Sequence, residues 1–483
     1  MGGILSRLSS LVFTPVSPKL SHNQDMQSTR TIVILGGAYG GARAAQVLAA
    51  GVPDGWRIIL IDRNSHVNRW SNFRFHIFQS SQYATDVYVM PRFAVLSDHE
   101  YKAFIPFTHV FLKDPGSIPH LHLQAHIISL TKNTVTLNKA FPEHGIYSST
   151  IDFDYAIYAL GSHLPAPLDL WGTPADPENK DSARYYGEKS EGIEWLKAKQ
   201  QRVEAASTVL VVGGGALGIQ FATDIAAIYP HKKVTLLHSR DRLLPRFDEA
   251  MHYEVLRSLR DADIEVILGE RLDLGSIENG QGTVNVTTGR KVVRTVKGRE
   301  IEADLLLLCT GQKPNTQILS AFDPATVNPT DSLVHVLQTL QVGILPSTST
   351  SSAEKITQEE DTAETTPYPN LFAIGDAADA FGAIAAGHNA YYQGEVAARN
   401  IIRLIKQSEP SPAQDKKLQY THEPLELYTP RPPAIKVSLG LTKSVFQSAG
   451  VVDTRNDGVP DLQAASVWPF FGITPTKDED MIP

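Results

Sequence analysis

Apolar residues in this chain gather in short β-branched runs, each followed by glycines and then by a stretch with helical spacing. Thr31–Leu35 is such a run, residues 40–50 have the alanine-rich pattern of a helix, and Arg57–Ile61 is the next apolar run. The same order returns between Thr208–Val212 and Lys233–Leu237. Continuous apolar runs of this length are typical of strands buried in a parallel sheet. The two βαβ units therefore predict an α/β fold with two Rossmann-like, doubly wound domains.

Further apolar strands and one polar stretch set the expected domain boundaries. Asp154–Leu160 and Ala303–Cys309 end in small polar turns, and Asn370–Ile374 leads toward a long helix at Ala385–Ile405. The stretch Pro346–Pro367 is rich in Ser and Thr and then acidic, which predicts a disordered surface loop. We expect a flexible leading segment at residues 1–30, a first domain at residues 31–162 and 331–410, a second domain at residues 163–330, and a small C-terminal domain at residues 420–483.

The second glycine turn has the full spacing of a dinucleotide-binding motif. Gly213-Gly214-Gly215-Ala216-Leu217-Gly218 lies between a predicted strand and a predicted helix. The first glycine permits the tight turn, the second lets the backbone approach a pyrophosphate, and the third packs the helix against the strand. The helix N-terminus adds partial positive charge. A glycine turn that binds nothing is the alternative, and the strand–turn–helix context argues against it.

The first glycine turn matches the same motif less strictly. In Gly36-Gly37-Ala38-Tyr39-Gly40-Gly41, Ala38 stands where the motif has its second glycine, and its methyl group narrows the approach to a phosphate. Asp62 ends the second strand of this unit, where an acid binds the hydroxyls of an adenosine ribose. Asp62 is a match independent of the glycines, so the sequence predicts a second dinucleotide site.

The corresponding strand of the second unit ends without an acid. Its last residues are His238-Ser239-Arg240, and Arg242 follows. A carboxylate at this place would bind the ribose of NAD and repel the 2′-phosphate of NADP. Its absence beside arginines favours NADPH, or tolerance of both nucleotides. The alternative is that Arg240 and Arg242 are ordinary surface charges.

Composition excludes several classes of protein. The net charge of −8 argues against a nucleic-acid partner. Cys309 is the single cysteine, so an internal disulfide, a Cys-x-x-Cys redox pair and a cysteine-rich zinc site are excluded. Any redox chemistry must come from a bound cofactor. Cys309 itself lies in an apolar strand and is predicted to be an inert core thiol.

These motifs together resemble a known family. From roughly Thr31 to Ile405 the chain is similar to the pyridine nucleotide–disulfide oxidoreductase superfamily, and within it to the apoptosis-inducing-factor-like group that includes ferroptosis suppressor protein. It also resembles, less closely, the type II NADH dehydrogenases. The matching segments are the two glycine turns with their strands, Pro91–Val95, Lys102–Pro106, Ala159–Ser162, Cys309–Gly311 and Leu371–Asp379.

The resemblance implies the cofactors and the residues that hold them. FAD is expected at the first motif, and Gly375-Asp376 is expected to hold its ribityl and phosphate region. NADPH or NADH is expected as co-substrate at the second motif. The implied FAD residues are Gly36, Gly37, Ala38, Tyr39, Gly40, Gly41, Asp62, Arg92, Lys102, Gly161, Gly375 and Asp376. The implied NAD(P)H residues are Gly213, Gly215, Gly218, His238, Arg240, Thr310 and Gly311.

Three departures from the family pattern bear on the electron acceptor. Gln220 stands where the family usually has a glutamate near the nicotinamide and flavin. Some ubiquinone-reducing relatives carry a lysine before the last helix, and Phe381-Gly382 occupies that stretch here. Trp70–Thr85 looks like an insertion, or an error in the gene model.

The sequence therefore predicts an enzyme that passes hydride from NAD(P)H via FAD to an electron acceptor. Because the chain has no cysteine pair, the expected acceptor is a quinone or another small molecule. No catalytic acid or base is evident. Gln220 and the missing lysine motivate an alternative, an FAD-dependent oxidoreductase that acts on a specialised-metabolite intermediate. A further alternative is a slow-turnover, redox-sensing flavoprotein.

Two other clusters have competing interpretations. His120, His122 and His126 are closely spaced, but without carboxylate partners a half-exposed strand is favoured over a metal site. Trp468–Phe471 is an aromatic cluster that could touch a membrane or a quinone. A dimer or domain contact is the favoured reading of that cluster.

The N-terminus carries competing targeting signals. Gly2 and Ser6 fit an N-myristoylation pattern, and Arg7 and Lys19 lie in a serine-containing, acid-poor stretch. We expect membrane association through an N-terminal lipid anchor. A mitochondrial transit peptide, or a cytoplasmic protein with a tail that carries no signal, are the alternatives. The chain has no run of about 18 apolar residues, so no membrane-spanning helix is expected.

Overall fold

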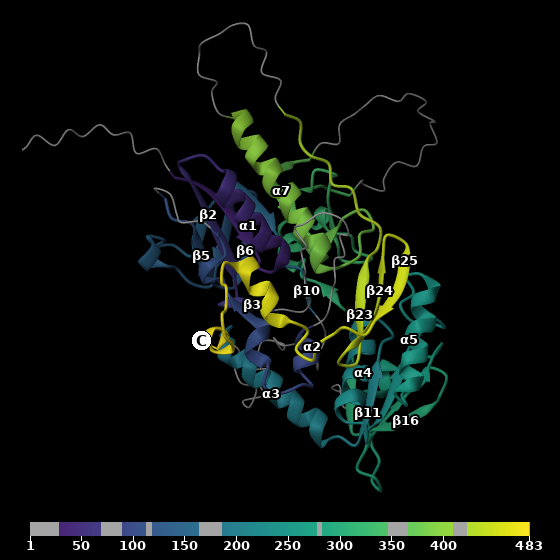
Figure 1. The fold of residues 1–483 in the computed structure, drawn as a ribbon. Coiled ribbons are helices and arrows are strands. Elements are labelled where there is room, and N and C mark those ends of the chain that lie inside the picture. Colours follow the sequence, from purple (N-terminus) through teal and green to yellow (C-terminus); the bar gives the residue numbers. More distant parts are fainter. Residues whose placement is uncertain are drawn as a thin grey trace, which may run out of the picture.

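A computed structural model describes residues 29–68, 89–112, 118–163, 186–277, 283–345, 366–408 and 423–482. The predicted N-terminal anchor, the Trp70–Thr85 segment and nearly all of the Pro346–Pro367 stretch lie outside these residues. Figure 1 shows two α/β units one above the other, with a small antiparallel sheet beside the lower one. This is the α/β architecture that the apolar pattern predicts.

The first domain is built on a six-stranded sheet in which every neighbouring pair is parallel except β20 and β21. Its strands, in sheet order, are β20 (Gln341–Val342), β21 (Tyr368–Ala373), β9 (Tyr155–Tyr158), β1 (Arg30–Leu35), β2 (Trp56–Asp62) and β5 (Leu121–Gln124). The last four residues of β1 are fully buried, because helices and loops cover both faces of the sheet.

Helices α1 (Tyr39–Gly51) and α7 (Gly387–Ser408) lie side by side against this sheet (Figure 1). Two glycines allow their close approach. A Cβ at Gly394 would lie 2.3 Å from the carbonyl oxygen of Gly40, and a Cβ at Gly40 would lie 2.6 Å from that of Ala390. The backbone of the first glycine turn is thus pressed directly against α7.

The second domain repeats the arrangement with a four-stranded parallel sheet. Its strands, in sheet order, are β13 (Glu265–Ile267), β12 (Lys233–Leu237), β11 (Thr208–Val212) and β17 (Leu305–Leu308). Its helices are α3 (Lys189–Ala205), α4 (Ala216–Ile228) and α5 (Glu249–Asp261). An antiparallel sheet of β14 (Thr283–Val284), β15 (Lys291–Arg294) and β16 (Glu300–Ala303) flanks it.

A two-stranded antiparallel ribbon carries the chain between the domains. β10 (Ser162–His163) belongs to the outgoing crossing and β18 (Lys313–Pro314) to the returning one. Beyond β18, Leu319 of α6 (Gln317–Phe322) and Val327 are buried in the core of the first domain. The return to the first domain therefore lies near residue 313, earlier than the expected boundary at 331.

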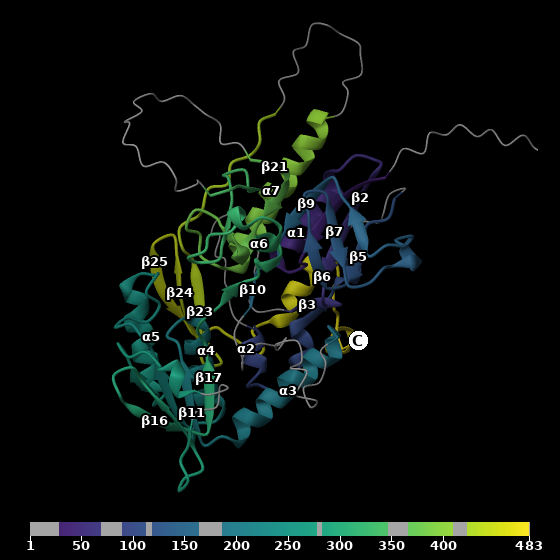
Figure 2. The same ribbon diagram turned by 180° about the vertical axis from the view of Figure 1, so that it is seen from behind.

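The C-terminal domain is a three-stranded antiparallel sheet that packs on the second domain. Its strands are β23 (Ile435–Leu439), β24 (Lys443–Ser448) and β25 (Val451–Arg455), and β23 and β24 contact α4 and α5 (Figures 1 and 2). The remaining small elements are α2 (Val89–Phe93), β3 (His66–Asn68) with β4 (Phe104–Pro106), β6 (Ile127–Leu130), β7 (Thr134–Leu137), β8 (Thr150–Asp152), and β19 (Val334–His335) with β22 (Ala378–Asp379).

The chain then crosses back to the first domain in the 3₁₀ segment Ala464–Phe471. Trp468 is almost completely buried there, and its indole N–H donates to the carbonyl oxygen of Lys102 at 3.2 Å. The aromatic cluster is therefore a contact between domains of one chain, in agreement with the favoured interpretation of a dimer or domain contact. Among the described helices, none is both long and apolar enough to cross a membrane.

Candidate active site

The two glycine turns open into one cavity of about 920 Å³ between the domains. The carboxyl ends of β1, β2, β9 and β21 meet at one side of the cavity, which is where open parallel sheets bind ligands. Of the residues predicted from sequence, Gly36, Ala38, Tyr39, Gly40, Gly41, Asp62, Gly161, Gly375, Asp376, Gly215, Arg240, Thr310 and Gly311 line it. The fold thus brings residues of both predicted nucleotide sites to the same space.

The first glycine turn is closed so tightly that side chains do not fit in it. Gly36 has φ +100°, and a Cβ there would lie 2.4 Å from the carbonyl oxygen of Ala159. A Cβ at Gly41 would lie only 1.8 Å from the carbonyl oxygen of Gly36. Ala38 caps the N-terminus of α1 and lines the cavity. The turn leaves the start of α1 open toward the cavity, as a phosphate cradle requires.

Asp62 ends β2 beside this turn and presents a carboxylate to the cavity. Its Oδ2 accepts the amide N–H of Gly37 at 2.8 Å, and its Oδ1 accepts the backbone and side-chain N–H groups of Asn64 at 2.9 Å. Burial raises the pKa of Asp62, while these N–H donors favour its charged form. A ribose with two hydroxyl donors suits this carboxylate.

The second glycine turn has the same construction and is open where a pyrophosphate would approach. Gly213 has φ +127°, and a Cβ there would lie 2.7 Å from the carbonyl oxygen of Cys309. A Cβ at Gly218 would lie 1.9 Å from the carbonyl oxygen of Gly213. A Cβ at Gly215 would meet nothing within 4 Å, and this residue caps α4 and lines the cavity. Gly213 and Gly218 shape the turn, and Gly215 faces the space it encloses.

Comparison with known proteins decides the family. The family model described as pyridine nucleotide-disulphide oxidoreductase matches residues 30–394. The chain belongs to this family. The expected resemblance and the expected fold class are confirmed.

Three relatives illustrate the range of similarity within and around the family. Fe-regulated protein 8 of Mycosarcoma maydis is 36% identical over 451 residues, covering 92% of this chain and 96% of that protein. Ferroptosis suppressor protein 1 of Homo sapiens is 25% identical over 430 residues, covering 87% of this chain and 88% of that protein. The structure of the water-forming NADH oxidase from Lactobacillus brevis bound to NADH has the same fold, with a TM-score of 0.52 and 16% identity over 86% of this chain and 74% of that one.

Membership makes the protein an FAD-dependent NAD(P)H oxidoreductase. The cavity fits both nucleotides, because it contains two glycine cradles at helix N-termini and one of them carries an acid for a ribose. The prediction that FAD lies in the cradle of the first domain, beside Asp62, and NAD(P)H in that of the second domain, beside Arg240, is compatible with this geometry.

Two cations that the resemblance places on the flavin side lie elsewhere. Arg92 is fully buried, its Nε donates to Oδ2 of Asp224 on α4 at 2.8 Å, and its other nitrogens donate to the carbonyl oxygens of Pro460 and Gly440 at 2.7 Å. Lys102 pairs with two carboxylates of the C-terminal region. The expectation that these residues contact FAD is therefore wrong. Their segment leaves the first sheet and packs between α4 and the C-terminal domain.

His238 also has a structural place in this protein. Its Nδ1 accepts the amide N–H of Gly214 at 3.0 Å, and its Nε2 lies 3.2 Å from the carbonyl oxygen of Arg242. Burial lowers the pKa of His238, which suits a neutral ring that accepts at one nitrogen and donates at the other. His238 braces the glycine turn from behind and does not line the cavity. Gly37 is likewise outside the lining, and a Cβ there would lie 2.4 Å from the ring of Phe107.

Sequence patterns missed several polar residues of the cavity wall. Arg246, Gln312 and Asn315 line it, and none belongs to a glycine motif. Gln312 directly follows Thr310-Gly311, which is the one signal that could have pointed to it. Gln220 is fully buried on α4 and is not part of the lining.

The closely spaced histidines form no metal site in the part of the chain that the structure describes. His122 is half-buried on β5 against the ring of Phe107, and desolvation lowers its pKa to about 4. His126 lines the cavity near Asp62. These residues belong to a strand at the edge of the sheet and to the loop after it.

Proposed function

We propose that this protein passes hydride from NAD(P)H through FAD to a quinone or another small electron acceptor, and not to a protein disulfide. The observation that carries the proposal is the single cysteine. Cys309 follows β17, its pKa is raised by burial, and the sequence offers no second thiol to form a redox pair with it. A two-electron acceptor must therefore come from outside the chain.

The chain's own contribution is to hold two nucleotides at one cavity. Bound FAD supplies the redox chemistry, taking up a hydride and releasing two electrons. The two glycine turns would hold the phosphates, Asp62 would hold a ribose, and the walls from both domains would line the space in which the two nucleotides meet. The similarity to ferroptosis suppressor protein supports a quinone as acceptor, since the resemblance described above extends to ubiquinone-reducing relatives.

A panel of acceptors tests this proposal. Purified protein, loaded with FAD, is mixed with NADPH or NADH and with a short-chain quinone, ferricyanide, dioxygen or glutathione disulfide. We expect turnover with the quinone and none with the disulfide. Fastest turnover with glutathione disulfide would refute the proposal. Flavin reduction without turnover on any acceptor would favour the redox-sensing alternative.

We further propose that NADPH serves at least as well as NADH. Arg240 and Arg246 both line the cavity on the side of the second domain. The guanidinium of Arg242 donates to the carbonyl oxygens of Pro245 and Phe247 and so is held by its own loop. Among the described residues, none forms a hydrogen bond or an ion pair with the Arg240 side chain. That leaves Arg240 as the cation best placed for a 2′-phosphate.

We also propose reversible attachment to membranes through the N-terminus. The support is Gly2 with Ser6, followed by Arg7 and Lys19. One acyl chain gives only marginal binding, so nearby basic residues would have to contribute, at about 1 kcal/mol each. Trp468 is buried and cannot add contact. Fractionation of wild type against Gly2→Ala, with intact-mass analysis, tests this. An unacylated Gly2 in a soluble protein would contradict it.

A further inference from the structure

The two crossings between the domains run side by side, and glycines flank both. In the ribbon, Ser162 pairs with Pro314 and His163 with Lys313. Gly161 precedes the outgoing strand with φ +59°, and Gly311 lies before the returning strand with φ +81°. Both glycines have left-handed backbones that L side chains rarely adopt, and both line the cavity. Glycines at such positions are typical of places where domains change their relative orientation.

The side of the ribbon next to the first domain is firmly anchored. The amide N–H of Asn315 donates to the carbonyl oxygen of Gly161 at 2.9 Å, and its side-chain N–H donates to that of Leu160 at 2.8 Å. The hydroxyl of Tyr158, on β9, donates to the carbonyl oxygen of Asn315 at 2.6 Å. Movement of the second domain must therefore be taken up on the other side of this anchor, at Gln312 and the residues before it.

Both crossings hold the same carboxylate. Ser162 Oγ donates to Oδ2 of Asp376 at 2.9 Å, and Gln312 Nε2 donates to the same oxygen at 2.8 Å. Gln312 also contacts Ser162 directly. Asp376 stands just beyond β21 in the first domain, and all three residues line the cavity. One oxygen of the first domain thus receives a donor from each strand that leads to the second domain.

We propose that Ser162 and Gln312 are positioning residues that couple the binding of FAD, in contact with Asp376, to the placement of the NAD(P)H-binding domain. A ligand that fixes the position of the Asp376 carboxylate also fixes the acceptor to which Ser162 and Gln312 donate. It therefore favours one orientation of the second domain and a formed nucleotide cradle. Such coupling is reciprocal, so each nucleotide tightens the binding of the other. This inference rests on the assignment of FAD to the first domain and not on the identity of the acceptor.

The test measures binding and needs no turnover. The probes are ADP-ribose and its 2′-phosphate, which lack the nicotinamide and so cannot bind FAD directly. Their dissociation constants are measured by calorimetry with apo-protein and with FAD-loaded protein. We expect FAD to tighten the better probe by at least about fivefold in wild type. Equal affinity with and without FAD would overturn the proposal at once.

Variants assign that coupling to the two residues. In the double variant Ser162→Ala with Gln312→Leu, we expect the tightening by FAD to vanish and FAD itself to bind roughly tenfold more weakly, because a charged acceptor loses two donors. Lys313→Met is the matched control, since Lys313 lies on the same ribbon but does not line the cavity. It should retain the wild-type coupling. Undiminished coupling in the double variant, or an equal loss in the control, would overturn the proposal.

A pH profile separates this role from a merely structural one. Gln312→Glu places a second carboxylate beside Asp376, where two like charges repel and share a proton more readily. At neutral pH this variant should behave like the double variant. On acidification a shared proton should restore the bridge, so the coupling should return toward the wild-type value. A variant that is simply misfolded would show no recovery, and pH-independent coupling in Gln312→Glu would contradict the inference.

Discussion

Asp376 is the single residue on which we expect flavin binding to depend most. It lies at the carboxyl end of β21, in the cavity, where two neutral donors hold its carboxylate. We expect the wild-type protein to be yellow and to carry FAD, and Asp376→Ala to bind FAD roughly tenfold or more weakly. Flavin absorbance per mole of purified protein measures the effect. Asp379→Ala, which removes an exposed carboxylate three residues later, should keep its flavin. Full flavin content in Asp376→Ala would contradict the assignment.

Arg240 is the residue on which we expect the choice of nucleotide to depend. A charge-assisted bond to a 2′-phosphate is worth on the order of 1.5–3 kcal/mol. Arg240→Ala should therefore raise the KM for NADPH by about tenfold or more and change that for NADH much less. Arg260→Ala is the control, because it removes an exposed charge from the end of α5. Equal effects of Arg240→Ala on both nucleotides would show that Arg240 does not bind the phosphate.

Glycine positions in the site could be predicted from sequence, whereas the partners of its cations could not. Gly36, Gly41, Gly213 and Gly218 occupy turns where a Cβ meets backbone, so the motif itself states the geometry. A cation such as Arg92 carries no comparable signature. Its guanidinium suits a carboxylate, a carbonyl or a phosphate, and only the packing of distant segments decides which of these it meets.

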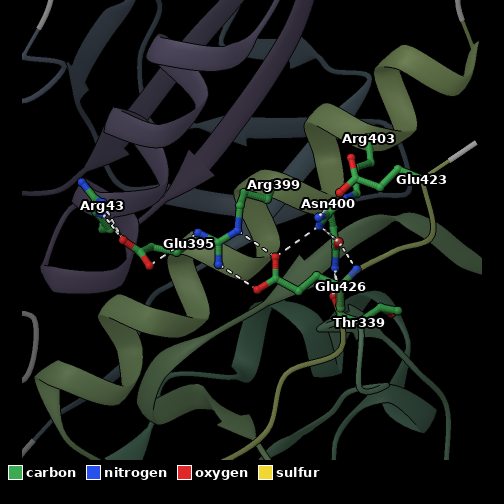
Figure 3. Close-up of polar contacts among 8 residues, drawn as sticks. All are labelled: Arg43, Thr339, Glu395, Arg399, Asn400, Arg403, Glu423 and Glu426. Atoms are coloured by element: carbon green, nitrogen blue, oxygen red, sulfur yellow. Dashed lines mark hydrogen bonds and ion pairs between the residues drawn. The ribbon is translucent and has the colours of Figure 1, made fainter.

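At the scale of elements, α7 is held to the rest of the first domain by a chain of charges. Figure 3 shows Glu395 between Arg43 of α1 and Arg399, and Glu426 reaching both Arg399 and Arg403. The Nε of Arg399 lies 2.7 Å from Oε2 of Glu426, in a two-point contact. These bonds tie the irregular segment that begins at residue 423 to α7. The periodicity of apolar residues predicts α7, but it does not predict these ion pairs with Glu426.

Glu426 makes the link sensitive to acid. Hydrogen bonds from Arg399 hold the pKa of Glu426 below its ordinary value, with a smaller contribution from Arg403. A depressed carboxyl pKa in the folded state stabilises the fold above the unfolded-state value, and this is lost as the pH falls through the folded-state value. Glu426→Gln should lower the free energy of unfolding at pH 7 by about 1–2 kcal/mol.

Denaturant unfolding at pH 7 and at a series of pH values below 4.5 measures this effect. The gap in unfolding free energy between wild type and Glu426→Gln should narrow progressively below pH 4.5, because protonation of Glu426 in wild type then removes the same charge. Glu423→Gln is the control, since that side chain is mostly exposed and, within the described part of the chain, forms an ion pair with Arg403 alone. Glu423→Gln should lower the free energy of unfolding by less than Glu426→Gln does. A gap that stays constant with pH would show that the charge of Glu426 does not stabilise the fold.

At the scale of the whole molecule, the repeated βαβ pattern was sufficient to predict two doubly wound domains, because each strand and glycine turn is local in sequence. The joints between the domains are not local. Residues 89–104 leave the first sheet to pack with α4 and the C-terminal sheet, and Ala464–Phe471 returns to the first domain. Such crossings depend on contacts between segments hundreds of residues apart, such as Trp468 with Lys102.

The ion pair of Arg92 with Asp224 is the most deeply buried of these joints. Both side chains have no exposed surface, and Arg92 also satisfies two carbonyl oxygens of the C-terminal domain. Arg92→Met should lower the free energy of unfolding by about 3–5 kcal/mol, because Asp224 is left as an unpaired buried acid. Burial already raises the pKa of Asp224, so in this variant it should take up a proton.

The double variant Arg92→Met with Asp224→Leu separates the cost of an orphaned charge from the value of the pair. It should recover much of the lost stability, but not all, because the carbonyl oxygens of Gly440 and Pro460 still lack their donor. Chemical unfolding of FAD-saturated protein gives the free energies, and absorbance gives the flavin content of the folded fraction. Since Arg92 does not line the cavity, folded Arg92→Met should carry FAD as wild type does. Loss of flavin from folded protein would show that Arg92 contributes to the flavin site. Retained flavin with lowered stability would show that Arg92 instead stabilises the packing of its own segment against α4 and the C-terminal domain.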